Sequence, residues 1–443
     1  MDCIFLVTLF VAGLDVGHSF TCYETRNNPI TKVIRRPYHT SSSSSSLCAK
    51  KSKKKSSGGK NRSTGVKGFG SGVKSSLSSS SSSSASVNQI DRSRKTLQFY
   101  DFIEKNKAGA NLKRVAIGTC TIKSPDSDEN IDIRGVVALR DIKKGEDILS
   151  IPYELALNLG REGNDPTLPA YMLLQEICRH APSEVVLDKG LVDYSPYISM
   201  LPEFNGPDCL SSTDFFSDEA LDALQFPVIK EETLLRRKLT QARFDRDVQP
   251  MIDIGAGGGS NALAADMNND PITFRYLQWA VWLITSRVLT VQGADGSGQA
   301  FRLMIPFIDM CNHDRNSPHI LSGRAVPGGM LRVVAGADIK AGEQVNICYG
   351  GGVAGNDRFI QDYGFLDWSG DNDGAMAYDI VTKKLLKGNQ GLTFQERDEA
   401  MEALSNTSIL EDQNLLNVTS KSDLKAAISY RIGIKKSLER VKV

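Results

Sequence analysis

The chain has 443 residues, which is enough for more than one domain and a sizeable hydrophobic core. Its 53 Lys and Arg are balanced by 52 Asp and Glu, so the net charge of +1 gives no indication of nucleic-acid binding. The basic residues are unevenly distributed, because residues 21–90 contain 13 Lys or Arg and a single acid, Glu24. The rest of the chain is therefore net acidic.

The first part of the chain has the composition of a targeting sequence. Residues 1–19 resemble a signal peptide: an apolar run at residues 3–14 is too short to span a bilayer, and small residues follow it, although no positive charge precedes it. Residues 20–95 are rich in Ser and Lys, like a transit peptide, and we expect them to be disordered. The combination resembles the bipartite presequence of algae with secondary plastids. It predicts a mature protein in the plastid (chloroplast) stroma without a membrane segment; a secreted or a cytoplasmic protein is the alternative.

The cysteines do not form a recognisable framework. They lie at positions 3, 22, 48, 120, 178, 209, 311 and 348, and no two of them form a CxxC pair. This spacing argues against both a zinc ribbon and a set of disulfides. We expect the five in the folded part to be free thiols, which suits a reducing compartment.

Helix and strand patterns alternate along the folded part, which we expect to begin near Thr96. A helical stretch at residues 95–108 precedes strand-like runs at residues 115–122, 134–142 and 147–159. Helical periodicity then covers residues 167–181, 219–244 and 271–292, with a glycine-rich link at residues 253–270.

Strand-like runs return near the end of the folded part, at residues 302–308, 330–339 and 343–350. From about Gly374 the pattern is helical again. Thr393 and Glu396 have the spacing of a capping box, and Ser422 has the position of an N-cap. The order is strands, a long helical insert, strands, and helices, which predicts an α+β fold.

The segment MIDIGAGGGSN, residues 251–261, has the glycine content of a nucleotide-binding loop. Such a loop requires a buried strand before it and a helix directly after it. Here charged residues precede the loop and a polar stretch follows as far as Pro271. We therefore interpret it as a link between helices.

Asp309, Cys311, His313 and Asp314 form a dense polar group, with His319 nearby. Alternate residues of a strand share a face, as metal ligands would require. A zinc site, however, requires three or four nitrogen or sulfur donors at fixed geometry. We therefore predict no metal site, and we assign no role to Cys311 or Asp314.

Five separated motifs occur in a fixed order along the chain. They are RGVVALRDIKKGEDILSIP (134–152), SPYISMLP (195–202), WLITSR (282–287), IPFIDMCNH (305–313) and AGEQVNICYGGGVAGNDRFIQDYGFLD (341–367). Together they resemble the SET-domain protein methyltransferases, in the branch typified by Rubisco large-subunit lysine methyltransferase. The resemblance covers roughly residues 110–370.

This resemblance implies an α+β architecture built on a SET-domain β-fold with a pseudoknot. The SET domain would span residues 96–369, with a helical insert at about residues 162–300. A short helical substrate-docking region would follow at residues 370–443. The implied activity is S-adenosyl-L-methionine-dependent methylation of a protein lysine.

The resemblance also implies roles for single residues. Tyr349 matches the catalytic tyrosine and also contacts the cofactor. The other positions that match cofactor-binding residues are Asp132, Arg134, Gly135, Val136, Arg287, Asn312, His313 and Tyr363. The positions that match the substrate channel are Leu289, which replaces a phenylalanine of the plant enzyme, Asp309, Tyr363 and Phe365.

The implied partner is a non-histone protein, such as the Rubisco large subunit or a plastid aldolase, bound by a monomeric enzyme. Two alternatives stay open. The segment DMCNH is equally similar to a relative that methylates a histidine of actin, which leaves a protein-histidine methyltransferase as one alternative. The other is a non-catalytic SET-like peptide-binding protein.

Overall fold

The computed structural model describes residues 89–123, 130–180, 192–206, 211–256, 265–266, 268, 270–294, 298–352, 354–367 and 402–440. The expected targeting sequence up to residue 88, Cys209 and the expected capping box at Thr393 and Glu396 lie outside the described residues. Within these ranges, no helix has the length and apolar character needed to cross a membrane. The four described cysteines, Cys120, Cys178, Cys311 and Cys348, are free thiols, as predicted.

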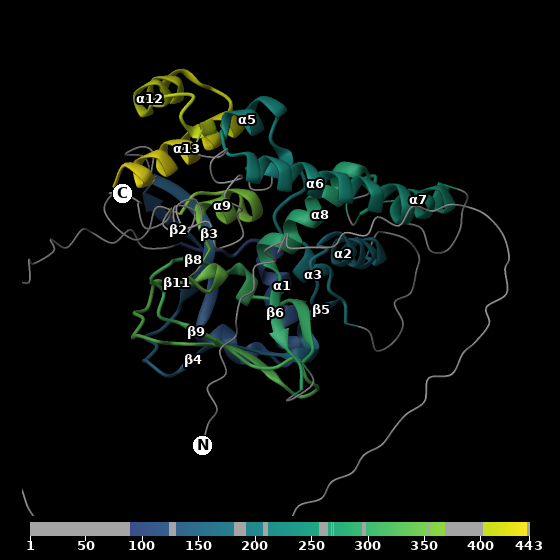
Figure 1. Cartoon of the computed structure of the whole chain (residues 1–443). Helices are drawn as coiled ribbons and strands as arrows, with labels where there is room; N and C mark the ends of the chain where they lie inside the picture. The colour runs from purple at the N-terminus through teal and green to yellow at the C-terminus, as the bar shows by residue number, and fades with distance from the viewer. Residues whose placement is uncertain are drawn as a thin grey trace, which may run out of the picture. The chain divides into compact units, whose positions relative to one another are not determined.

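The strands form three small sheets (Figure 1). The first has the order β1-β2-β3-β11-β8, antiparallel except for the parallel pair β11 and β8. Its strands are β1 (Gln89–Ile90), β2 (Val115–Lys123), β3 (Asn130–Ala138), β11 (Gln344–Ile347) and β8 (Asn312–His313). This sheet joins the beginning and the end of the predicted SET domain.

The two other sheets have three antiparallel strands each. One has the order β4 (Asp147–Pro152), β10 (Met330–Val334) and β9 (Ile320–Ser322). The other has the order β5 (Leu157–Arg161), β7 (Ala300–Met304) and β6 (Leu289–Gln292).

Ordered structure begins earlier than the sequence indicated. Residues 89–95 were expected to be disordered, but Gln89 and Ile90 pair with β2, and helix α1 (Arg94–Lys105) has already begun at Arg94. The Ser93 side chain accepts a hydrogen bond from the Thr96 amide and caps this helix.

The described residues between β5 and β6 are mostly helical (Figure 1). They are α2 (Thr167–Arg179), α3 (Ser195–Ile198), α5 (Asp218–Ala223), α6 (Pro227–Arg243), α7 (Gln249–Ala256) and α8 (Phe274–Arg287). The single helix predicted at residues 219–244 is wrong. Gln225 has a φ of 50°, and Pro227 cannot donate to a preceding carbonyl, so the chain restarts as α6.

Two predicted boundaries near the glycine-rich segment and the following helix are also wrong. The glycine-rich link does not begin at residue 253, because α7 continues to Ala256, and a helix rather than a strand therefore precedes the glycines. The helix predicted at residues 271–292 ends at Arg287, where the β-branched run that starts at Val288 turns into β6 and pairs with β7.

The strand predicted at residues 302–308 is shorter than expected. It ends at Met304, because Pro306 follows and Phe307 has a left-handed φ of 70°. The chain then forms the short helix η5 (Ile308–Met310) and reaches β8.

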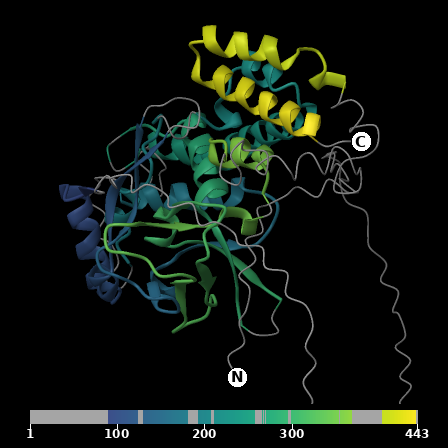
Figure 2. The same cartoon turned by 90° about the vertical axis from the view of Figure 1, so that its left-hand side faces the viewer.

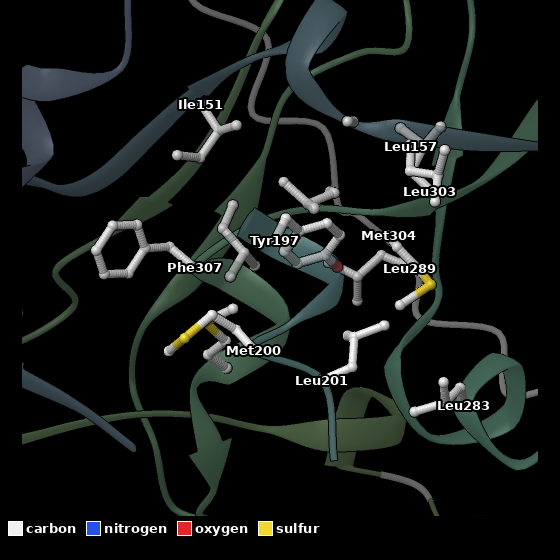
Figure 3. Close-up of a cluster of buried hydrophobic side chains, with 14 of the residues drawn as sticks. Ile151, Leu157, Tyr197, Met200, Leu201, Leu283, Leu289, Leu303, Met304 and Phe307 are labelled. Carbon is white, nitrogen blue, oxygen red and sulfur yellow. The ribbon is translucent and has the colours of Figure 1, made fainter. Parts of the chain in front are cut away.

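The main hydrophobic core lies between the sheets and α1, α2 and α8. Figure 3 shows its centre, where Tyr197 of α3 is surrounded by Leu289, Leu303 and Met304 of the third sheet and by Phe307. Tyr197 and Phe307 are fully buried. The only polar atom of the Tyr197 side chain is its hydroxyl oxygen, which therefore requires a buried partner, described below.

The last part of the chain forms an antiparallel pair of helices (Figure 2). Helix α12 (Ile409–Val418) begins with a capping box of Ser408 and Glu411, and helix α13 (Ser422–Arg440) begins at Ser422 itself, which is thus not its N-cap. Arg431 and Lys435 of α13 both bind the buried Asp412 at 2.7 Å, and α13 packs against α5 through a second hydrophobic cluster.

Candidate functional site

Tyr349 lies two residues after the end of β11, at the start of the short helix η6 (Tyr349–Gly352). Its hydroxyl donates a hydrogen bond of 2.6 Å to the carbonyl of Cys311. Burial raises the pKa of the Tyr349 hydroxyl well above its usual range, against the opposing charge of Arg287. The hydroxyl therefore keeps its proton at neutral pH and remains a donor to Cys311.

His313 fixes the backbone of Tyr349. Its Nδ1 accepts a hydrogen bond of 3.0 Å from the Tyr349 amide, so the proton of the neutral ring is on Nε2. Nε2 faces the Asp367 carboxylate at 3.3 Å, and Arg315 binds the same carboxylate oxygen at 2.6 Å. The sequence indicated a functional role for His313 but none for Asp367 or Arg315.

Aromatic rings surround Tyr349 on the side of the last motif. The ring of Tyr363 is stacked on that of Tyr349, with centroids 5.0 Å apart and an interplanar angle of 27°. Phe359 and Phe365 follow at 5.4 and 6.0 Å from Tyr363. Phe365 is 38% exposed and forms the outer edge of this aromatic cluster, which leads from solvent to the partly buried Tyr349.

Tyr363 is held by an unusual piece of backbone. It ends the π-helical turn η7 (Phe359–Tyr363), which continues from the short helix α9 (Asn356–Arg358). Gly364 then reverses the chain with a left-handed φ of 84°. Single π-helical turns are often found at functional sites.

Asp309 is buried, and its charge acts on the Tyr349 hydroxyl. Its Oδ2 accepts a hydrogen bond of 2.7 Å from the Tyr197 hydroxyl, and its carbonyl accepts one of 2.8 Å from Arg287 Nη1. Arg287 Nη1 also lies 3.9 Å from Asp309 Oδ2. Burial raises the pKa of the Asp309 carboxyl to about 6, although Arg287 and Tyr197 oppose the shift.

Two buried polar atoms in this group have no hydrogen-bond partner among the described residues. They are Asp309 Oδ1 and Arg287 Nε. A buried acceptor and a buried donor without partners are costly unless a bound molecule satisfies them. The Asp309 side chain has no exposed surface. A substrate ammonium could therefore make the predicted contact with Asp309 only by entering the interior of the protein.

Gly135 lies where β3 loses its pairing with β11, which contacts β3 only at Val136 and Val137. The Asn312 amide donates a hydrogen bond of 3.0 Å to the Arg134 carbonyl. A Cβ at Gly135 would lie 2.6 Å from Asn312 Nδ2 and 2.8 Å from Gln344 Nε2. Glycine is thus required for Asn312 to approach the backbone.

The remaining predicted cofactor positions are placed differently. Val136 lies within the sheet, opposite Ile117 and Val345, and its side chain is part of the core. Asp132 is exposed and accepts a hydrogen bond of 2.7 Å from Thr121. Among the described contacts, none joins Asp132 to the Tyr349 cluster.

Leu289, predicted to line the substrate channel, is a buried residue of β6 opposite Leu303 (Figure 3). The sequence did not single out its neighbour Tyr197, although the motif SPYISMLP contains it. The Cys311 carbonyl was also missed, because backbone atoms leave no signal in a residue pattern.

The four polar residues at 309–314 do not converge. Asp309 binds Tyr197, His313 binds Tyr349 and Asp367, and the Cys311 thiol contacts the Phe307 carbonyl. In the described part of the chain, no three His, Cys, Asp or Glu residues are arranged to hold a metal ion.

Comparisons with known proteins give the following matches. Residues 133–350 match the family model of the SET domain. The chain is also similar to solved structures of the SET domain of LSMT with lysine and AdoHcy (16% identity, 78% of this chain, 90% of that chain, TM-score 0.49) and of Rubisco LSMT with AdoMet (16% identity, 79% and 90%, TM-score 0.48). No curated protein matches the chain significantly.

Proposed function

The chain contains a SET domain at residues 133–350, and from this we propose that the protein is an S-adenosylmethionine-dependent protein-lysine methyltransferase. The predicted SET-domain fold is confirmed by the match. The observation that carries the proposed activity is the position of Tyr349. Its ring is stacked on Tyr363 in the aromatic cluster, and the charges of Arg287 and Asp309, which each carry a buried atom without a partner among the described residues, act on its hydroxyl.

The residues around Tyr349 fit the cofactor of this family. S-adenosylmethionine supplies an electrophilic methyl group on a sulfonium and carries an amino-acid end and an adenine. Arg287 Nε is a buried donor suited to a carboxylate. The sheet edge at Arg134 and Gly135, with the Asn312 amide, offers backbone and amide groups for further hydrogen bonds.

The residues of the chain would prepare the acceptor amine for reaction. A lysine has an unperturbed pKa of about 10.4 and must lose a proton before it can act as a nucleophile. Passage along Phe365 and Tyr363 removes water from the ammonium and lowers its pKa. The Tyr349 oxygen, whose proton is donated to Cys311, can then accept polarised C–H or N–H groups.

We propose that the acceptor is a non-histone protein in a plastid, such as the Rubisco large subunit or an aldolase, and that the enzyme acts as a monomer. The support for the location is the Ser- and Lys-rich composition of residues 20–95. Neither the acceptor protein nor its residue follows from the site, because the residues around Tyr349 would contact only the side chain that is methylated.

The test is transfer of tritium from labelled S-adenosylmethionine into algal plastid proteins, followed by mass spectrometry of the labelled peptides. We expect methyl-lysine in one or a few proteins, and no label with Tyr349→Phe. Methyl-histidine would instead identify a protein-histidine methyltransferase. If the folded protein binds S-adenosylhomocysteine in a calorimeter but labels nothing, it is a non-catalytic binding protein. Absence of binding would overturn the assignment of the cofactor site.

A further inference from the structure

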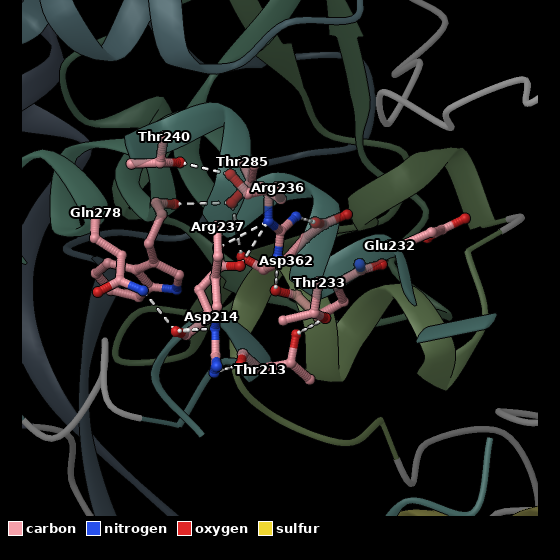
Figure 4. Close-up of polar contacts among 12 residues, drawn as sticks. Thr213, Asp214, Glu232, Thr233, Arg236, Arg237, Thr240, Gln278, Thr285 and Asp362 are labelled. Atoms are coloured by element: carbon pink, nitrogen blue, oxygen red, sulfur yellow. Dashed lines mark hydrogen bonds and ion pairs between the residues drawn. The ribbon is translucent and has the colours of Figure 1, made fainter. Parts of the chain in front are cut away.

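A buried network of charges joins the helical insert to the segment that carries Tyr363 (Figure 4). Its centre is Arg236 of α6, which is 8% exposed. Arg236 donates from Nε to Asp214 at 2.9 Å and from Nη1 to Asp362 at 2.6 Å. Its Nη2 donates to the Gln361 carbonyl at 2.8 Å. One guanidinium thus binds two carboxylates and a backbone carbonyl at once.

The two residues that carry these carboxylates are also anchored through their backbone carbonyls. Asp214 lies in the short helix η3 (Thr213–Phe215), and its carbonyl accepts hydrogen bonds from Gln278 at 2.6 Å and from Arg237 at 2.9 Å. The carbonyl of Asp362 accepts one of 3.2 Å from Thr285 of α8. The network therefore connects three parts of the insert, namely η3, α6 and α8, to η7.

A contribution to stability does not by itself account for this arrangement. Burial raises the pKa of the Asp214 carboxyl in spite of Arg236, which reflects the cost of removing these charges from water. Apolar residues of similar volume commonly replace a buried ion pair without loss of stability. What the network does supply is a fixed geometry, because a guanidinium binds its partners in a rigid planar fork.

The geometry is fixed directly beside Tyr363. Arg236 holds Asp362 and the carbonyl of Gln361, the two residues before Tyr363 in η7. A π-helical turn is less regular than an α-helix and relies more on anchors outside it. A shift of η7 would move the ring of Tyr363 relative to Tyr349, on which it is stacked.

We propose that Arg236 is a positioning residue for methyl transfer, and that through Asp362 it sets the position of Tyr363 against Tyr349. The proposal rests on the methyltransferase function proposed above. It gives the insert a role in the chemistry, because a side chain of the insert binds the two residues that precede the second aromatic ring of the site.

Arg243 provides a matched control on the same helix. It binds Asp165 at 2.7 Å and Asp247 at 2.6 Å, so it too bridges two carboxylates. Its third bond, from Nε, is to Thr167 at 3.0 Å, and none of its described partners belongs to η7. Arg243→Lys should therefore remove guanidinium hydrogen bonds of the same kind as Arg236→Lys, but leave Tyr363 in place.

The first measurement is fluorine NMR of protein labelled with 3-fluorotyrosine, which gives one signal for each of the 12 tyrosines. Tyr349→Phe and Tyr363→Phe assign the two signals of the site. We expect Arg236→Lys to shift or broaden both signals and Arg243→Lys to leave them unchanged. Unchanged signals in Arg236→Lys would overturn the proposal, whether or not the protein is an enzyme.

The second measurement is transfer of tritium from saturating S-adenosylmethionine into plastid proteins. We expect Arg236→Lys to lower the rate by about tenfold to a hundredfold. Its affinity for S-adenosylhomocysteine should stay within about threefold of wild type.

A triple variant with Arg236→Met, Asp214→Leu and Asp362→Leu removes the charges together and separates positioning from folding. It should melt near the wild-type temperature and still be slow; a wild-type rate would overturn the proposal. A wild type that transfers nothing would reject the proposed function, while the fluorine signals still decide the role of Arg236.

Discussion

The hydroxyl of Tyr349 and the carbonyl of Cys311 are joined by a hydrogen bond of 2.6 Å, across 38 positions of sequence. It joins the residue before β8 to the second residue after β11, and these two strands are the only parallel pair among the described strands. A phenol has a single proton to donate, and here that proton is used inside the protein. The lone pairs of the oxygen are then the part of the Tyr349 side chain that is left to contact a bound molecule.

Tyr349→Phe should separate the chemistry from binding. We expect the rate of methyl transfer to fall by at least about a hundredfold, because the oxygen beside the reacting groups is lost. The free energy of unfolding should fall by only about 1 kcal/mol, since the Cys311 carbonyl loses one partner. S-adenosylhomocysteine affinity, measured by calorimetry, should change less than about threefold. Tyr153→Phe, which removes a hydroxyl bound to Asn158, is the control and should keep full activity. A Tyr349→Phe protein with wild-type transfer would show that Tyr349 is not catalytic.

Asp309 should make stability depend on pH. Its pKa is about 6 in the folded protein, against about 3.9 for an unperturbed Asp. Between these values the folded state binds more protons than the unfolded state, so the free energy of unfolding falls as pH rises through this window. Asp309→Asn lacks the effect. Between pH 5 and pH 7.5, the free energy of unfolding measured in urea should therefore fall by about 1 kcal/mol more in wild type than in the variant. A difference that is independent of pH would contradict the assigned shift.

The motifs of the sequence single out residues that the structure places close together. Tyr349, His313 and Tyr363 were identified from the motifs NICYG, IDMCNH and DYGF, and the structure brings their rings together. Short-range patterns also gave most of the strands. These features depend on neighbouring residues in the chain, so a linear pattern retains them.

The Arg236 network was not predictable in the same way. Arg236 and Asp362 are 126 positions apart, and a charged helix such as α6 is normally read as a solvated surface. The same limitation applies to Phe307, which has a left-handed φ and packs against Phe99 with ring centroids 5.1 Å apart. Tertiary contacts override local preference at both positions, and they shape the site.

Gly135→Ala should weaken cofactor binding. The new Cβ would lie 2.6 Å from Asn312 Nδ2, so Asn312 must move away from the Arg134 carbonyl. We expect about a tenfold loss of S-adenosylhomocysteine affinity in calorimetry. The free energy of unfolding should fall by about 1–3 kcal/mol, which lowers the melting temperature by roughly 5 °C. Gly163→Ala, which meets no atom within 4 Å, should leave both quantities unchanged. Equal affinity in the two variants would exclude Gly135 from the cofactor site.

Gly364→Ala should slow methyl transfer through the backbone that holds Tyr363. Gly364 has a φ of 84°, a conformation that costs an alanine about 1 kcal/mol or more. Gly145 has a φ of 87° in an open turn away from the site, with no atom within 4 Å of an added Cβ. Both alanine variants should therefore lose about 1 kcal/mol in urea unfolding. Only Gly364→Ala should also lower the rate at saturating S-adenosylmethionine, by about tenfold, because the strain is relieved by moving Tyr363 and Phe365. If Gly145→Ala slowed transfer equally, the loss would reflect stability, and the backbone at Gly364 would have no special part in placing the aromatic cluster.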